Sequence, residues 1–116
     1  MCDSDRVIDV ADKVSAFQNL LSSAGSKYVY AFFYSKGCGH CDALMPYVGT
    51  FRNRCISKQS NAIIVFINRQ TASELFQAYN VTSFPQVMVF RGGKLVKHIK
   101  GNDQPAVAQA FALAGL

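Results

Sequence analysis

Two cysteines three positions apart, Cys38 and Cys41, are the residues of this chain best placed to carry chemistry. They follow the aromatic run Phe32-Phe33-Tyr34, which is typical of a buried strand, and they stand where the pattern predicts the start of a helix. At a helix N-terminus the backbone N–H groups lack partners within the helix, and the macrodipole favours negative charge. We therefore expect a pair of sulfurs that alternates between dithiol and disulfide.

The two sulfurs of this pair should have different roles. We expect Cys38 at the exposed start of the helix, where the helix terminus lowers the pKa of its thiol from about 8.5 toward neutrality and makes it the attacking thiolate. Cys41, one turn further in, would resolve the mixed disulfide. His40 lies between them, and its imidazolium would favour the thiolate and so make the disulfide a stronger oxidant.

Length and composition fit a single domain over residues 1–116, long enough to bury a core. The net charge is +5, but the basic residues are spread along the chain without the block of like charges that a nucleic-acid arm would show. We expect a monomer with a solvated basic surface and no nucleic-acid partner. With no apolar run of about 18 residues and no apolar stretch behind a basic start, the sequence predicts no membrane span and a cytoplasmic location.

Apolar periodicity and turn residues predict alternating strands and helices. Strands are expected over 6–10, 28–34, 62–67, 87–90 and 95–99, and helices over 14–24, 38–57, 73–79 and 104–114. Asp9 or Asp12 could cap the first helix, Pro46 should bend the second, and Asp103 should cap the last. Alternation implies parallel pairing with right-handed crossovers, and the closing hairpin adds antiparallel strands. The predicted fold is α/β, a mixed central sheet of about five strands flanked by four helices.

This order of elements, with Cys38-Gly39-His40-Cys41 after the second strand, resembles the thioredoxin family over almost the whole chain. Further residues that agree with thioredoxins are Pro46, Tyr79, Pro85, Gly93 and Gly101. The dipeptide between the cysteines, however, is the one seen in the catalytic domains of protein disulfide isomerases.

The resemblance implies a thiol-disulfide oxidoreductase that reduces protein disulfides, and that could also oxidise or isomerise them, with no cofactor beyond the Cys38–Cys41 disulfide. It implies a cis peptide bond at Phe84–Pro85 beside Cys38, with the Phe84 backbone pairing with the substrate main chain. Gly37 and Gly39 would belong to the same substrate-binding surface. The implied reductant is a thioredoxin reductase or a glutathione-type thiol.

Two positions depart from the family pattern. Gly37 stands where these families usually have tryptophan, and Phe32 stands where they have a buried acid that accepts the proton of the second cysteine. With an apolar neighbour, desolvation should raise the pKa of the Cys41 thiol. We therefore expect slow resolution of mixed disulfides. Lys36 could add positive charge near the thiolate, although a solvated turn lysine is the simpler interpretation.

Several alternatives remain at this point. A zinc site would need a second closely spaced pair, which Cys2, Cys55 and His98 do not form. A c-type haem would need histidine directly after the second cysteine, where Asp42 stands, and a glutaredoxin-like glutathione site fits the residues before Pro85 poorly. The main rival is a protein-binding module of the same fold whose redox centre is vestigial or regulatory.

Overall fold

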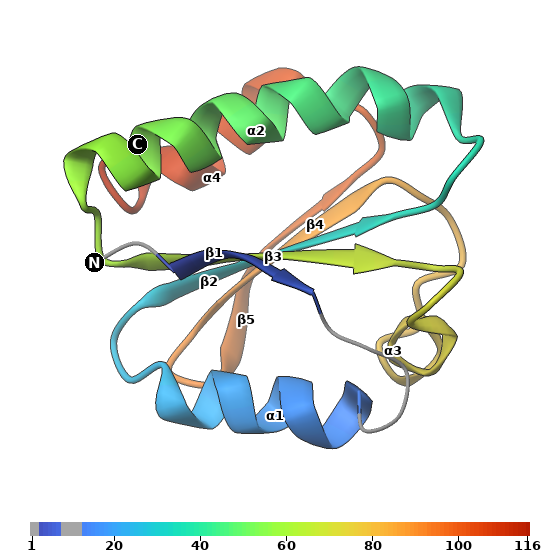
Figure 1. Cartoon of the computed structure of the whole chain (residues 1–116), viewed down its shortest axis with the longest axis horizontal. Coiled ribbons are helices and arrows are strands. Elements are labelled where there is room, and N and C mark those ends of the chain that lie inside the picture. The colour runs from blue at the N-terminus through green and yellow to red at the C-terminus, as the bar shows by residue number, and fades with distance from the viewer. Residues whose placement is uncertain (1–2, 8–12) are drawn as a thin grey trace.

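The computed structural model describes residues 3–7 and 13–116, which form a five-stranded sheet with helices on both faces (Figure 1). In chain order the elements are β1 Asp3–Val7, α1 Lys13–Ser23, β2 Tyr28–Tyr34, α2 Gly39–Lys58, β3 Ala62–Asn68, α3 Ser73–Ala78, β4 Gln86–Arg91, β5 Lys94–Lys100 and α4 Gln104–Ala112. This order confirms the predicted alternation and the closing hairpin. No helix in the described ranges is both long enough and apolar enough to cross a membrane.

The strand order across the sheet is β1-β3-β2-β4-β5. β2 pairs in parallel with β3 along its whole length, from Tyr28 opposite Ala62 to Tyr34 opposite Asn68, and antiparallel with β4. α2 and α4 cover one face of the sheet, while α1 and α3 lie on the other (Figure 1). The mixed sheet flanked by four helices is therefore confirmed, and β2 is its central strand.

The first strand lies earlier than predicted. β1 is described over Asp3–Val7, so it begins at Asp3 and not at Arg6, and it pairs in parallel with β3 at the edge of the sheet. The apolar residues near Val7 indicated a strand, but the pairing partner on β3 sets where it begins. Residues 8–10 of the predicted strand and the candidate caps Asp9 and Asp12 lie outside the described residues.

The side chains of β2 supply both halves of the core. Val29, Ala31 and Phe33 belong to the cluster under α1 and α3, whereas Tyr30 and Phe32 belong to the cluster under α2 and α4. Alternate residues of a strand point to opposite faces, so a strand covered on both faces is apolar throughout. The aromatic run before the cysteines is thus the centre of the molecule.

Aromatic stacking holds α2 and α4 against the face of the sheet that carries Tyr30 and Phe32. The Phe111 ring stacks on Tyr30 at 4.3 Å and on Phe51 at 4.6 Å between ring centroids, and the Tyr30 hydroxyl donates to the Ala110 carbonyl at 2.8 Å. α2 continues on both sides of Pro46, and the predicted bend there stays a prediction. Because this packing anchors the body of α2, its N-terminus stays fixed beside the end of β2.

Candidate functional site

Both cysteines of the motif lie at the start of α2, as predicted. Cys38 is the N-cap residue with an extended backbone (φ −98°, ψ 112°), and α2 begins at Gly39. The preceding Gly37 has φ +75°, a conformation that costs glycine little and that side chains with a Cβ rarely adopt. The chain therefore turns sharply from β2 into the helix with Cys38 at the corner.

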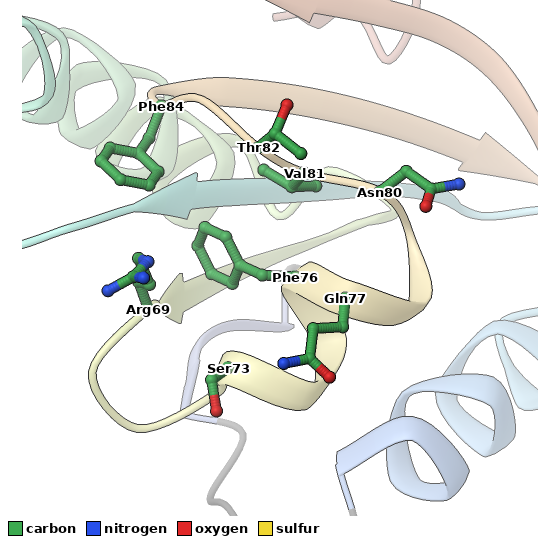
Figure 2. Close-up of a pocket in the computed structure, with 8 residues that line it drawn as sticks. All are labelled: Arg69, Ser73, Phe76, Gln77, Asn80, Val81, Thr82 and Phe84. Atoms are coloured by element: carbon green, nitrogen blue, oxygen red, sulfur yellow. The ribbon is translucent and has the colours of Figure 1, made fainter.

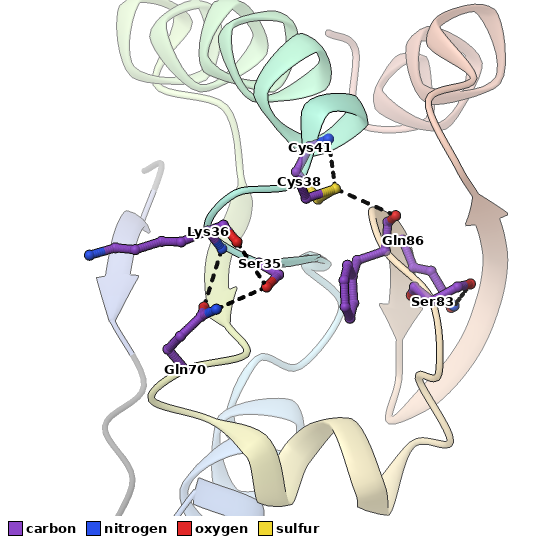
Figure 3. The surroundings of a disulfide bond; sticks show 8 residues. Ser35, Lys36, Cys38, Cys41, Gln70, Ser83 and Gln86 are labelled. Atoms are coloured by element: carbon purple, nitrogen blue, oxygen red, sulfur yellow. Dashed lines mark hydrogen bonds between the residues drawn. A yellow bond between two sulfur atoms is a disulfide. The ribbon is translucent and has the colours of Figure 1, made fainter.

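Cys38 and Cys41 are joined by a disulfide, with their Cα atoms 5.2 Å apart, so the structure describes the oxidised form (Figure 3). Cys38 is half-buried, while Cys41 is fully buried. The Cys41 backbone N–H donates to Cys38 Sγ at 3.2 Å. A free helix N–H group thus already points at the more accessible sulfur, where it would stabilise a thiolate in the reduced form.

The loop before β4 forms the other side of the site. The Phe84–Pro85 peptide bond is cis, as the family resemblance implied, and the Phe84 carbonyl oxygen lies 3.7 Å from Cys38 Sγ. Pro85 is buried and Phe84 is half-buried. The structure thus brings Cys38, Phe84 and Pro85 together although 46 residues separate Cys38 from Phe84.

The other predicted site residues surround the disulfide at the surface. Gly37, Gly39 and His40 are all exposed. Lys36 is also exposed, and Figure 3 shows its side chain extending away from the cysteine pair. Its charge therefore adds little at the sulfurs, and the interpretation of Lys36 as a solvated turn residue is the better one.

A hydrogen-bonded chain behind the cis-proline loop was not predicted from the sequence. The Gln86 side chain is buried and donates to the Ser83 carbonyl at 3.0 Å and to the Ser83 hydroxyl at 3.3 Å. Its amide oxygen lies 2.6 Å from His98 Nε2 on β5. Partial desolvation of its ring, and then the nearby Lys100 charge, hold the pKa of His98 below its ordinary value. His98 is exposed on β5, and through Gln86 it ties the hairpin to the loop that carries Phe84.

A second unpredicted contact fixes the turn before the cysteines. Gln70, in the β3–α3 loop, accepts from the Lys36 backbone N–H at 3.2 Å and donates to the Ser35 hydroxyl at 3.0 Å (Figure 3). Ser35 is buried, and a buried hydroxyl needs such a partner. The only sequence signal was a serine directly after a buried strand.

Phe32, at the position of the expected acid, is enclosed by other aromatic rings. It is buried, stacks on Tyr34 at 5.6 Å and meets Phe66 edge-on at 5.9 Å. Among residues 14–116 the buried polar side chains are those of Ser35 and Gln86, and the three acids in this range, Asp42, Glu74 and Asp103, are exposed. Residues 14–116 therefore supply no buried carboxylate that could take the proton of Cys41.

The arrangement does not favour the zinc alternative. In the described ranges, no three His, Cys, Asp or Glu side chains come together as a metal would require, and Cys38 and Cys41 are bonded to each other. Cys55 is buried near the end of α2. Cys2 lies outside the described residues.

Comparisons with known proteins agree with this geometry. The Thioredoxin family profile matches residues 8–112. Thioredoxin-2 of Saccharomyces cerevisiae is 29% identical over 98 residues, covering 84% of this chain and 89% of that protein. Protein disulfide-isomerase of Drosophila melanogaster is 30% identical over 90 residues, covering 78% of this chain but only 18% of that much longer protein.

Solved structures show the same fold. The thioredoxin of Fasciola hepatica superposes with a TM-score of 0.78 at 17% identity, covering 94% of this chain and 98% of that one. Members of this family work through a redox-active disulfide and need no separate cofactor. The profile match shows that this chain belongs to the thioredoxin family, and the strand order and the Cys38–Cys41 pair at the start of α2 agree with it.

Proposed function

We propose that this chain is a thiol-disulfide oxidoreductase that reduces disulfides in proteins and can also run in the oxidising or isomerising direction. The observation that carries the proposal is the position of Cys38. Cys38 is half-buried, and its sulfur accepts the Cys41 N–H and lies beside the cis-proline loop, while Cys41 is fully buried. One sulfur is therefore placed to meet a substrate and the other to finish the exchange.

The proposed reaction has two exchange steps. The Cys38 thiolate attacks one sulfur of the substrate disulfide, so that a bond from Cys38 to the substrate forms, the substrate S–S bond breaks, and the leaving thiolate takes up a proton from water. Cys41 then loses its proton and attacks Cys38, which forms the Cys38–Cys41 disulfide and releases the second substrate thiol. Two electrons pass from the dithiol to the substrate, and the reverse sequence oxidises a substrate dithiol.

Local electrostatics support Cys38 as the first nucleophile. The partial positive charge at the start of a helix stabilises a thiolate there, and the Cys41 N–H is already within hydrogen-bonding distance. His40 is exposed in the first turn of α2, where an imidazolium would add to this effect. Because a stabilised thiolate stabilises the reduced form, we assign His40 the role of making the disulfide more oxidising.

The substrate main chain would lie along the cis-proline loop. The Phe84 backbone beside Cys38 can pair with an extended peptide, as an unpaired sheet edge does. Gly37 and Gly39 border Cys38 without side chains, and a Cβ built on either would meet nothing within 4 Å. Pro85, which follows Phe84 in the same loop, is buried and anchors this surface.

The partners and location follow as part of the same proposal. The oxidised chain must gain two electrons before each further turnover, because its Cys38–Cys41 disulfide has to be reduced again. A thioredoxin reductase or a glutathione-type thiol would supply these electrons. Similarity to Thioredoxin-2 of yeast supports the reducing direction. Similarity to the protein disulfide-isomerase of Drosophila, together with the Gly39-His40 dipeptide, supports the oxidising or isomerising direction. The cytoplasmic location expected from the sequence stays a prediction.

Reduction of insulin by dithiothreitol tests the proposal. We expect the wild-type chain to accelerate insulin reduction at neutral pH, measured by the turbidity of the released chains, but to do so more slowly than a thioredoxin that has the buried acid. The control is the same assay with dithiothreitol alone. A rate no higher than this control would contradict the proposal and favour a binding module whose disulfide is vestigial.

A further inference from the structure

A groove opens next to the redox centre on the side of α3. Its volume is about 490 Å³, and it is bordered by the β3–α3 loop, by α3 and by the loop that leads to Pro85 (Figure 2). Residues that matter for its chemistry are Arg69, Phe76, Gln77, Asn80, Thr82 and Phe84. Of these residues, only Phe84 was predicted from the sequence to bind substrate.

Phe84 joins this groove to the disulfide. Its ring lines the groove, and its carbonyl oxygen lies 3.7 Å from Cys38 Sγ. A peptide whose disulfide reaches Cys38 would therefore place its neighbouring side chains at the mouth of the groove. What the groove can bind thus bears on which disulfides the chain attacks.

The groove combines an apolar wall with one positive charge. The rings of Phe76 and Phe84 meet edge-on at 6.0 Å, and the Arg69 guanidinium lies over the Phe84 ring at 5.8 Å from its centroid. Among the described residues that line the groove, Arg69 is the one with a charge, and Glu74 of α3 is not part of this lining. In the described ranges no carboxylate is paired with Arg69, so its guanidinium remains able to bind an acid.

The base of Arg69 is held in place. Its backbone N–H donates to the Tyr34 carbonyl at the end of β2, at 2.9 Å. The next residue, Gln70, is hydrogen-bonded to Ser35 and to the backbone of Lys36. The loop that carries Arg69 is thus tied to the same turn that positions Cys38. A residue on such a support can select substrates by orientation as well as by charge.

We infer that the groove binds the peptide segment next to the attacked disulfide and selects for an acidic side chain through Arg69. This inference rests on the proposed function and names its substrate class: peptide or protein disulfides that have a carboxylate and an apolar side chain close to the attacked cysteine. The carboxylate pairs with the Arg69 guanidinium, and the apolar side chain packs on Phe76 and Phe84. Asn80, Gln77 and Thr82 supply polar groups along the rest of the groove.

Two synthetic peptides test this assignment. Each is a disulfide-linked dimer of a short peptide that has one cysteine and one phenylalanine; one version carries glutamates on both sides of the cysteine, and the other carries glutamines. We expect wild-type kcat/KM to be roughly 3-fold higher for the glutamate peptide, the size expected of one exposed ion pair. Arg69→Gln should remove the preference, Arg69→Glu should reverse it, and high salt should weaken it in the wild type.

Lys94→Gln is the matched control, because it removes one positive charge from the opposite end of the hairpin. Lys94 is exposed and lies opposite Arg91 in the β4–β5 ladder, next to the hairpin turn. The cis-proline lies at the other end of the hairpin, before the start of β4. Lys94→Gln should keep the wild-type preference. Equal rates for both peptides in the wild type, or an unchanged preference in Arg69→Gln, would overturn the groove assignment and leave the oxidoreductase intact. Failure to reduce either peptide or insulin would overturn both.

Discussion

Replacing Cys41 with serine should convert the chain into a trap that stays covalently bound to its disulfide substrates. Cys38 keeps its position at the start of α2 and can still attack, but the sulfur that would release the substrate is gone. The substitution exchanges sulfur for oxygen at one fully buried position, so the fold should remain. With reduced Cys41→Ser and insulin or a peptide disulfide, we expect mixed disulfide to accumulate in most molecules, as seen by intact-mass measurement without reductant.

Cys38→Ser is the matched control for this experiment. In this variant Cys41 is the cysteine of the motif that remains. It has no exposed surface and cannot reach a protein disulfide. Cys38→Ser should therefore form no adduct through the motif and lose catalysis of insulin reduction by about 1000-fold or more, because the nucleophile itself is missing. Equal trapping by the two variants would show that Cys38 is not the attacking residue. Undiminished insulin reduction by Cys38→Ser would contradict the whole assignment.

The second step should depend steeply on pH, because residues 14–116 offer Cys41 no buried acid as an internal base. Phe32 occupies the position of the expected acid among Tyr34 and Phe66, and Cys41 is fully buried. Burial disfavours a charged sulfur, so only a small fraction of Cys41 is thiolate at neutral pH. That fraction rises about tenfold for each pH unit while most of the thiol is still protonated. We expect the resolution rate to rise in the same proportion between about pH 6 and pH 8.

Ellman's reagent separates the two steps in a single turnover. The attack of Cys38 releases one thionitrobenzoate anion, and the subsequent attack of Cys41 releases the second. The first phase should change less with pH than the second, since Cys38 is ionised more readily than Cys41 at the helix terminus. Cys41→Ser should show the first phase alone. A second phase with a flat pH profile would mean that another group takes the proton of Cys41.

Strand, turn and helix around the cysteines could be predicted because their signals are local. The apolar, aromatic run from Tyr28 to Tyr34 is long enough to indicate a buried central strand, and the predicted helix begins directly after Cys38, which is its N-cap. The cis Phe84–Pro85 bond and its place beside Cys38 could not be predicted this way. That expectation came from the likeness to a family, and the structure then confirmed it.

The contacts that hold the site together were missed because they join residues far apart in the sequence. Gln70 lies 35 residues after Ser35, and His98 lies 12 residues after Gln86. Nothing in the local pattern marks a glutamine as the partner of a distant serine or histidine. The groove was missed for the same reason, since Arg69 looks like an ordinary basic residue until the fold places it over Phe84.

The reduction potential of the Cys38–Cys41 couple, measured by equilibration with glutathione redox buffers, tests the central claim most directly. A redox centre stabilised at a helix terminus should equilibrate reversibly, with a potential between about −270 and −180 mV. His40→Leu should move this potential to a more negative value, because it removes positive charge beside the Cys38 thiolate. A wild-type potential below about −300 mV, typical of structural disulfides, would show that the pair does not exchange electrons with substrates and would contradict the account.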